Sequence, residues 1–275
     1  MTTHSNHLLD MAADYSGCST LLFRKLTSAK PSFEIRTMSQ AERLALDELG
    51  VRASSVFLTN STIWVEGVSD RLYFREYLRK YLEGRELQSK FREDTHYSFM
   101  EGGGANIAHF DFTGEITGKS AVYELTEKIR IAKVCSKSFV VLDGDNRGKP
   151  RMKDLELALG EDLFVLESKE IENLLPVEVL KAYLRLRGEI KDVELLKLED
   201  YHQKSWSLGK VLDEKFHTDR FTDGQTIKNK DGLCAFCVEF MRDNPKEWKL
   251  TPEAETLCQR LVAFIEKANN PPAGN

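Results

Sequence analysis

Acidic residues follow three apolar segments of this chain at positions where carboxylates could hold a metal ion. The acids form three groups: Glu66 and Asp70; Asp143 and Asp145 in FVVLDGDNRGK; and Glu167, Glu170 and Glu172 in LESKEIEN. Carboxylates brought so close repel one another unless a cation lies between them, and hard oxygen ligands of this kind suit Mg²⁺ or Mn²⁺. The usual task of such a site is phosphoryl transfer, in which one or two ions hold the phosphate and activate a water.

The elements that must position these acids alternate between strand and helix patterns. Apolar runs predict strands at Thr62–Gly67, His96–Gly104, Phe139–Asp145 and Asp162–Ser168, with helices at Ser69–Gly84 and Ala121–Cys135. In the second helix Val122, Leu125, Ile129 and Ala132 share one face. This alternation predicts an α/β fold, a parallel sheet with helices on both faces, followed by a mostly helical segment after Lys169. Since ligands bind at the carboxyl ends of such strands, we expect the acids to converge on one edge.

Each acid also has a simpler interpretation. Asp70 could favour the positive end of its own helix, DGD is a common turn sequence, and Glu170 and Glu172 could be solvated first-turn acids. The coincidence of three strand ends that terminate in acids favours the metal site.

A basic run directly follows DGD. It comprises Arg147, Lys149, Arg151 and Lys153. Such a run is most often a solvated loop, but beside a metal site it is well placed to contact a phosphodiester backbone.

Two further motifs do not predict sites. TGEITGKS imitates a phosphate-binding loop, but Thr113 stands where the required spacing has Gly. Cys234 and Cys237 have the spacing of half a zinc site without a second pair nearby, so we expect them to pack in a helix.

Composition excludes several classes of protein. The net charge of −5, with 41% apolar and 30% charged residues, does not indicate a chain coated with positive charge, although local patches could still bind nucleic acid. No apolar run approaches the length of a membrane span, and no signal peptide is evident. The odd number of cysteines, five, and their wide spacing predict reduced thiols in the cytoplasm.

Together these residues resemble the Toprim domain, a metal-dependent module of topoisomerases, primases and the OLD (overcoming lysogenization defect) family of nucleases. Glu66 matches the glutamate after the first strand, and Asp143 and Asp145 match the Asp-x-Asp after the third. The OLD version adds an aspartate, matched by Asp70, and an E-I-E-N segment, matched by 170–173. It also adds a late lysine, for which Lys230 is favoured, with Lys228 as the alternative. The resemblance implies a Toprim (Rossmann-like) sheet with a helical C-terminal extension.

The N-terminal segment adds to this resemblance. TTHSNHLLD looks like the switch-histidine segment of the ABC-type ATPase domain that precedes Toprim in OLD proteins, with His4 as the γ-phosphate sensor. The chain has no phosphate-binding loop, so we expect it to be the C-terminal part of a longer ATPase–nuclease. The expected division is an ATPase remnant and linker helix at 1–54, a Toprim domain at 55–245, and a C-terminal helix with a disordered tail at 246–275.

The resulting functional prediction is a Mg²⁺- or Mn²⁺-dependent endonuclease or nickase that hydrolyses DNA. The expected ligands are Glu66, Asp70, Asp143, Asp145, Glu170 and Glu172, with Lys230 stabilising charge on the phosphate. The resemblance implies a role in antiviral defence, a homo-oligomer, and an ATPase domain or subunit as partner. Two alternatives stay open: a non-catalytic Toprim assembly or nucleic-acid-binding module, and an RNA-directed nuclease.

Overall fold

The computed structural model describes residues 21–26, 32–37, 59–101, 110–111, 129–130, 137–150, 152–188, 190, 192–224 and 226–270. Several predictions fall on other residues and lie outside the described part: the segment with His4, the linker helix before residue 51, the TGEITGKS loop, Cys18, Cys135, Arg151 and the tail after Asn270.

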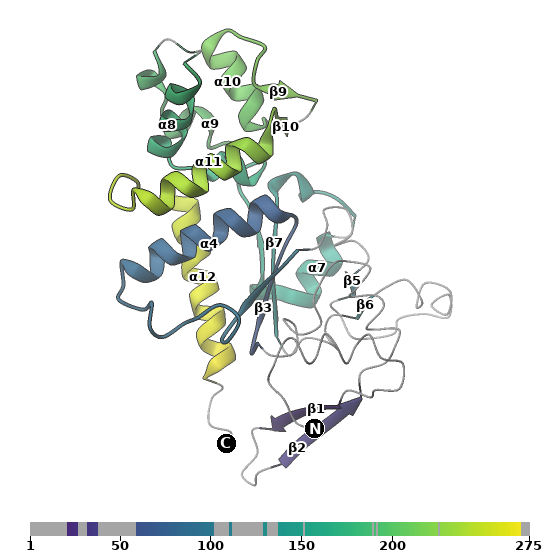
Figure 1. Cartoon of the computed structure of the whole chain (residues 1–275). Coiled ribbons are helices and arrows are strands. Elements are labelled where there is room, and N and C mark those ends of the chain that lie inside the picture. Colours follow the sequence, from purple (N-terminus) through teal and green to yellow (C-terminus); the bar gives the residue numbers. More distant parts are fainter. Residues whose placement is uncertain are drawn as a thin grey trace, which may run out of the picture.

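A four-stranded parallel sheet forms the centre of the molecule (Figure 1). Its strands are β3 (Thr62–Val65), β4 (Ser98–Glu101), β7 (Ser138–Leu142) and β8 (Leu163–Val165), in the spatial order β4-β3-β7-β8. All four were predicted from the apolar runs, and the α/β class with a parallel sheet is confirmed. Buried parallel strands need apolar side chains on both faces, which explains why these segments are continuously apolar rather than alternating.

The two faces of the sheet are covered by different elements. Ile63, Phe139 and Val141 belong to the main apolar core, which they share with the helices α4 (Val68–Glu83) and α12 (Pro252–Asn269). The intervening residues, such as Trp64 and Val140, are equally buried but point to the opposite face. On that side the short helix α7 (Met152–Leu159) packs against β8.

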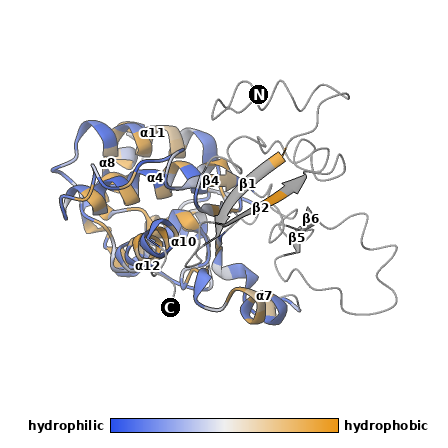
Figure 2. Ribbon diagram, turned by 90° about the horizontal axis from the view of Figure 1, so that it is seen from below, coloured by the Kyte–Doolittle hydropathy of each residue, from blue (hydrophilic) through white to orange (hydrophobic). Residues whose placement is uncertain are grey.

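Helix α4 confirms the helix predicted at Ser69–Gly84. Its two rows of apolar side chains at a spacing of four residues are buried: Tyr73, Tyr77 and Tyr81, and Phe74, Leu78 and Leu82. Hydrophobic positions recur along one side of α4, α8, α11 and α12, while the other side is hydrophilic (Figure 2). No helix among the described residues is long and apolar enough to span a bilayer.

Helix α12 runs antiparallel to the sheet strands. At its C-terminal end Asn269 donates a hydrogen bond to the carbonyl of His96, just before β4 begins, and Lys137, just before β7, bonds the carbonyl of Lys267. At its N-terminal end Glu253 contacts the segment after β8. One helix therefore connects the amino and carboxyl edges of the sheet.

The segment after β8 is mostly helical, as predicted, and its part before α12 gathers at one end of the described structure (Figure 1). It contains the 3-10 helices η4 (Ile171–Leu174) and η5 (Val193–Leu195), the helices α8 (Val177–Arg187), α9 (Leu198–Tyr201), α10 (Leu208–Phe216) and α11 (Lys230–Asp243), and a hairpin of β9 (Thr222–Asp223) and β10 (Thr226–Ile227). Cys234 and Cys237 are buried in α11, so the prediction that they pack in a helix is confirmed.

The predicted helix at Ala121–Cys135 is wrong at the two residues that the structure describes. Ile129–Arg130 forms the strand β6, which pairs in parallel with β5 (Phe110–Asp111). The apolar residues happen to recur at helical spacing, but Ile129 is β-branched and favours a strand. The pairing with β5 involves residues distant in sequence, so local periodicity does not indicate it. A hairpin of β1 (Leu21–Leu26) and β2 (Ser32–Thr37) was also not predicted.

Candidate active site

The carboxyl ends of β3 and β7 are joined by the side chain of Glu66. Glu66 follows β3 directly, and its Oε1 accepts hydrogen bonds from the backbone N–H of Asp143 (2.8 Å) and from Nδ2 of Asn146 (2.6 Å). The convergence of these two predicted strand ends is therefore observed. Burial is the main cause that raises the pKa of Glu66, and the nearby Asp145 carboxylate adds to it.

Gly144 allows the DGD turn to lie against the segment after β8. A Cβ atom at this position would overlap the carbonyl oxygen of Ser168 and lie 2.8 Å from that of Leu166. The backbone N–H of Asp145 also bonds the carbonyl of Lys169 (3.2 Å). The absence of a side chain at Gly144 thus brings the third group of acids beside the second.

Asp70 lies at the N-terminus of α4, where its Oδ2 accepts a hydrogen bond from the backbone N–H of Gly67 (2.8 Å). Its capping role is therefore real, but the side chain is also buried, with 5% of its surface exposed. Burial, together with the Glu172 and Glu66 carboxylates, raises the pKa of Asp70 to about 7, although Lys230 opposes the shift. Burial also raises the pKa of Asp143 well above its usual value, and Asp70, Glu66 and Glu172 add repulsion. Glu66, Asp70, Asp143 and Glu172, which we call the acidic cluster, therefore act on one another electrostatically.

Lys230 is a cation that faces the acidic cluster from the start of α11. Its Nζ lies 3.0 Å from Oε1 of Glu172, whose side chain is fully buried. Although burial lowers the pKa of Lys230, the Glu172, Asp70 and Asp143 carboxylates outweigh it and raise that pKa. The alternative lysine, Lys228, is exposed and forms no ion pair with a described residue. The geometry therefore favours Lys230 as the lysine of the site.

The acidic cluster fits a hard divalent cation by its chemistry. It places more carboxylates than cations in a buried region, and Oε2 of Glu172 has no hydrogen-bond partner among the described residues. A cation would relieve both the repulsion and this unpaired oxygen. However, within the described part of the chain no three His, Cys, Asp or Glu side chains are arranged to hold a metal ion. Side-chain movement is therefore needed before three of them can share one ion.

Three other predicted acids lie at the margin of this cluster. Glu170 is buried, but its two oxygens accept hydrogen bonds from the backbone N–H of Leu208 (2.9 Å) and from Thr226 (3.4 Å). Burial and the neighbouring Glu172 raise its pKa to about 7. Asp145 is half-exposed, 3.6 Å from Lys149, and Glu167 is exposed. Glu170 thus holds the start of α10 in place, and a metal-binding role for it and for Asp145 stays a prediction.

The basic loop after DGD is only partly free to bind a ligand. The guanidinium of Arg147 donates hydrogen bonds to the carbonyls of Val165 and Leu166, at the end of β8. Lys149 contacts Asn146 (3.1 Å) and Asp145, whereas Lys153 is exposed on α7. Contact with a phosphodiester backbone stays a prediction for these residues.

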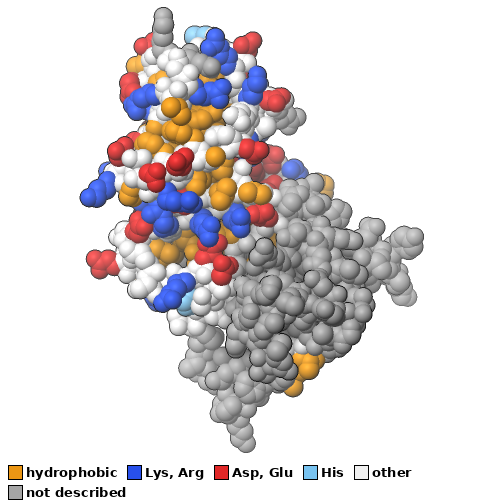
Figure 3. Space-filling view, viewed as in Figure 1, with side chains coloured by type: hydrophobic (Ala, Val, Ile, Leu, Met, Phe, Trp, Pro, Cys, Tyr) orange, Lys and Arg blue, Asp and Glu red, His pale blue; other side chains and the backbone are white. Residues whose placement is uncertain are grey.

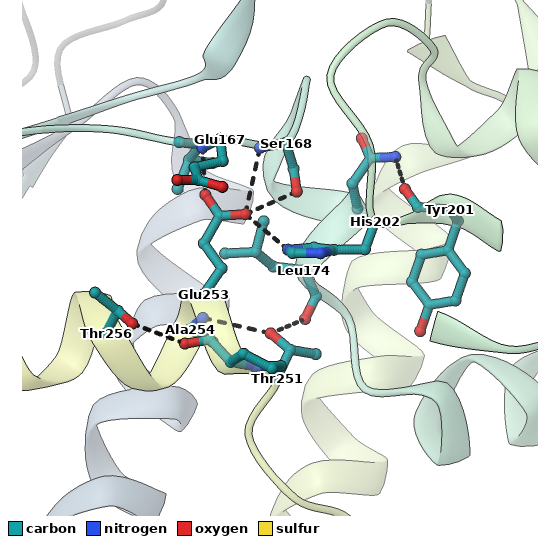
Figure 4. Close-up of polar contacts among 12 residues, drawn as sticks. Glu167, Ser168, Leu174, Tyr201, His202, Thr251, Glu253, Ala254 and Thr256 are labelled. Carbon is teal, nitrogen blue, oxygen red and sulfur yellow. Dashed lines mark hydrogen bonds and ion pairs between the residues drawn. The ribbon is translucent and has the colours of Figure 1, made fainter. Parts of the chain in front are cut away.

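A polar network around Glu253 was missed by the sequence analysis (Figure 4). Glu253, near the start of α12, accepts hydrogen bonds from the backbone of Glu167 and from Oγ of Ser168 (2.8 Å), and its Oε2 lies 2.8 Å from Nε2 of His202. Burial alone would raise the pKa of Glu253, but the bonds from His202, Ser168 and Glu167 lower it. The network anchors the start of the segment that carries Glu170 and Glu172. In the sequence, Thr-Pro-Glu at 251–253 indicates the start of a helix, but it does not indicate that Glu253 bonds the segment after β8.

Asn146 was also missed. Its side chain is buried and bonds Glu66, Asp145 and Lys149, so it orients the end of the DGD turn. Asparagine after two aspartates is typical of an ordinary turn, so no local pattern distinguishes Asn146 as a site residue.

No protein-family model, curated protein or solved structure matches the chain. The assignment to the Toprim and OLD families therefore stays a prediction from the motifs.

Proposed function

We propose that this chain is a Mg²⁺- or Mn²⁺-dependent nuclease that nicks or cleaves DNA. The observation that carries the proposal is the acidic cluster with Lys230, gathered at the carboxyl ends of parallel strands, where α/β sheets bind their ligands. The quartet of Glu66, Asp70, Asp143 and Glu172 matches the motif positions of an OLD-type Toprim domain. By the same resemblance, we propose an ATPase domain or subunit as partner and a role in antiviral defence.

The residues of the site have distinct roles in this proposal. The acidic cluster holds one or two ions, and Glu66 also fixes the backbone of Asp143. Lys230 stabilises negative charge that develops on the scissile phosphate. Bound metal would supply polarisation of the phosphate and a water of lowered pKa.

The direction from which DNA approaches follows from the distribution of basic residues. Lys and Arg side chains gather over α4 (Figure 3), but its arginines are already ion-paired with acids. The pairs join Arg71 to Glu101, Arg75 to Glu93, and Arg79 to Glu76 and Glu83. We therefore propose that the phosphodiester backbone approaches the carboxyl edge of the sheet rather than this face.

A supercoiled-plasmid assay with Mg²⁺, Mn²⁺ or EDTA tests the proposal. We expect nicking with metal, none in EDTA, and a loss of at least about 100-fold in rate for Glu66→Gln and Asp143→Asn, since each removes charge that holds the ion. Glu266→Gln is the matched control, because Glu266 is half-exposed near the opposite end of α12 and pairs with Lys90. Nicking that persists in EDTA or in both site variants would contradict the metal-site proposal.

The alternative is a non-catalytic assembly or nucleic-acid-binding module. The absence of three preassembled metal ligands among the described residues favours this alternative. Binding of nucleic acid without hydrolysis of DNA or RNA in either metal would support it, whereas hydrolysis of RNA alone would indicate an RNA-directed nuclease.

A further inference from the structure

Trp206 is the only tryptophan of the three in this chain with an exposed ring. Trp64 and Trp248 are buried, with 0% and 1% of their surface exposed, whereas 37% of Trp206 is exposed. It lies between α9 and α10, in a short segment that belongs to neither helix. A large aromatic ring that packing does not fully use is available to contact a ligand.

The segment that carries Trp206 is fixed to the segment that carries the third group of acids. The carbonyl of Trp206 accepts a hydrogen bond from Asn173 (3.3 Å), and the carbonyl of Gln203 accepts one from the backbone of Lys169 (3.0 Å). Two residues after the tryptophan, the N–H of Leu208 bonds Glu170. The backbone around Trp206 is therefore tied to the segment that carries Glu170 and Glu172 and is not an independent loop.

Two lysines without an ion pair among the described residues accompany Trp206, one over its ring and one nearby in the chain. The ammonium of Lys210 lies over the indole, 4.5 Å from the ring centroid, and Lys204 is exposed two residues before the tryptophan. Neither lysine forms an ion pair with a described residue, in contrast to the arginines of α4. An aromatic ring beside unpaired cations is the combination that binds a nucleobase and its phosphate.

We propose that Trp206 is a stacking platform for an unpaired base of a DNA strand, with Lys204 and Lys210 holding the adjacent phosphates. The inference rests on the proposed nuclease function and names its substrate class: DNA with single-stranded bases, such as a flap, a gap or an opened duplex. Bases inside a continuous duplex are stacked on one another and cannot reach the indole without being flipped out. Trp206 selects for unpaired bases without reading their identity, because every base has a π-face.

Binding of a labelled single-stranded oligodeoxynucleotide, followed by fluorescence anisotropy in EDTA, tests the platform without requiring hydrolysis. Loss of one stacking contact changes affinity by roughly 5- to 150-fold. We expect Trp206→Ala to weaken single-strand binding within that range, Trp206→Phe to restore most of it, and duplex binding of the same length to change little. Leu186→Ala is the matched control, because Leu186 is an exposed apolar side chain of α8. Binding of a ribo-oligonucleotide of the same sequence in preference to the deoxy-oligonucleotide would overturn the assignment to DNA.

A second readout separates stacking from a structural effect. Quenching of intrinsic fluorescence by the single strand is expected in the wild type and should disappear in Trp206→Phe, in which the two buried tryptophans remain. An unchanged affinity of Trp206→Ala, or an equal loss for single strand and duplex, would overturn the platform.

The two proposals fail in different ways. If Trp206→Ala binds and cleaves like the wild type while Glu66→Gln abolishes cleavage, only the platform is wrong. If no metal supports hydrolysis while single-strand binding depends on Trp206, the nuclease function is wrong and the platform stands as a binding site.

Discussion

Asp70→Asn should stabilise the metal-free protein at neutral pH, because it removes one charge from a buried group of like charges. The pKa of Asp70 is raised from 3.8 to about 7 by burial and by Glu172 and Glu66. Between these two pH values the folded state binds more protons than the unfolded state, so stability falls as pH rises from about 4 to about 7. Below that window both states are protonated, and above it the loss is complete.

The size of the effect follows from the shift. About three pK units at ~1.4 kcal/mol each give an upper bound of about 4 kcal/mol. Asp143 and Glu172 can keep a proton in place of Asp70, so we expect roughly half of this bound, about 2 kcal/mol, at pH 8. Asparagine preserves the hydrogen bond that Gly67 donates, so the difference reports charge rather than lost capping.

Urea unfolding in EDTA at pH 4.5 and pH 8 measures this difference. The stability gained by Asp70→Asn should be small at the lower pH and about 2 kcal/mol at the higher one. Asp154→Asn is the matched control: Asp154 occupies the same position in the first turn of α7 but is exposed and lies outside the acidic cluster. Adding Mg²⁺ at pH 8 should stabilise the wild type more than Asp70→Asn. An Asp70→Asn protein no more stable than the wild type at pH 8 would refute the reasoning.

Three other substitutions address the remaining parts of the site. Gly144→Ala should destabilise the protein by about 1–3 kcal/mol in urea unfolding and slow metal-dependent nicking, because its Cβ overlaps the carbonyl of Ser168; equal stability and activity would show that the segment can move aside. Lys230→Met should lower the free energy of unfolding by about 2 kcal/mol, which is less than is usual for a buried pair because Lys230 is one-third exposed. The loss should be smaller in Mg²⁺, since the ion would then balance the charge of Glu172. A loss unaffected by metal would contradict this. Glu253→Gln should lower the free energy of unfolding by about 1–2 kcal/mol at pH 7. The lowered pKa of Glu253 gives stability that is present above the ordinary value of 4.5, so the cost should decrease as the pH falls below 4.5. A cost that does not depend on pH would indicate packing alone.

The sheet and the order of its acids could be predicted because both depend on short-range patterns. Each buried parallel strand is a short apolar run, and an acid placed just after it must lie at the carboxyl edge. This reasoning located Glu66 and Asp143, whereas the preference for Lys230 over Lys228 came from the resemblance to the OLD family. It failed at Ile129, where the partner strand is distant in sequence and helical spacing arose by coincidence.

The rest of the site depends on contacts between residues far apart in the chain. Glu253 reaches Ser168 across many intervening residues, and nothing in the local sequence encodes that bond. Glu170 matched a motif, yet its carboxylate bonds the backbone of Leu208, which only the packing of α10 reveals. Sequence pattern thus predicted which acids could meet, whereas tertiary packing decides which of them keep free oxygens.

The antiparallel course of α12 also determines when the site can form during protein synthesis. The last strand of the sheet ends at Val165, but one face of the sheet is closed by Phe264 and its neighbours in a helix that ends at Asn269. Until that helix has left the ribosome, α4 covers this face of the sheet only in part, and the segment after β8 lacks its anchor at Glu253. The anchored arrangement of the acidic residues in a nascent chain is therefore delayed until synthesis has passed the last turn of α12, and chaperones can bind the exposed apolar surface in that interval.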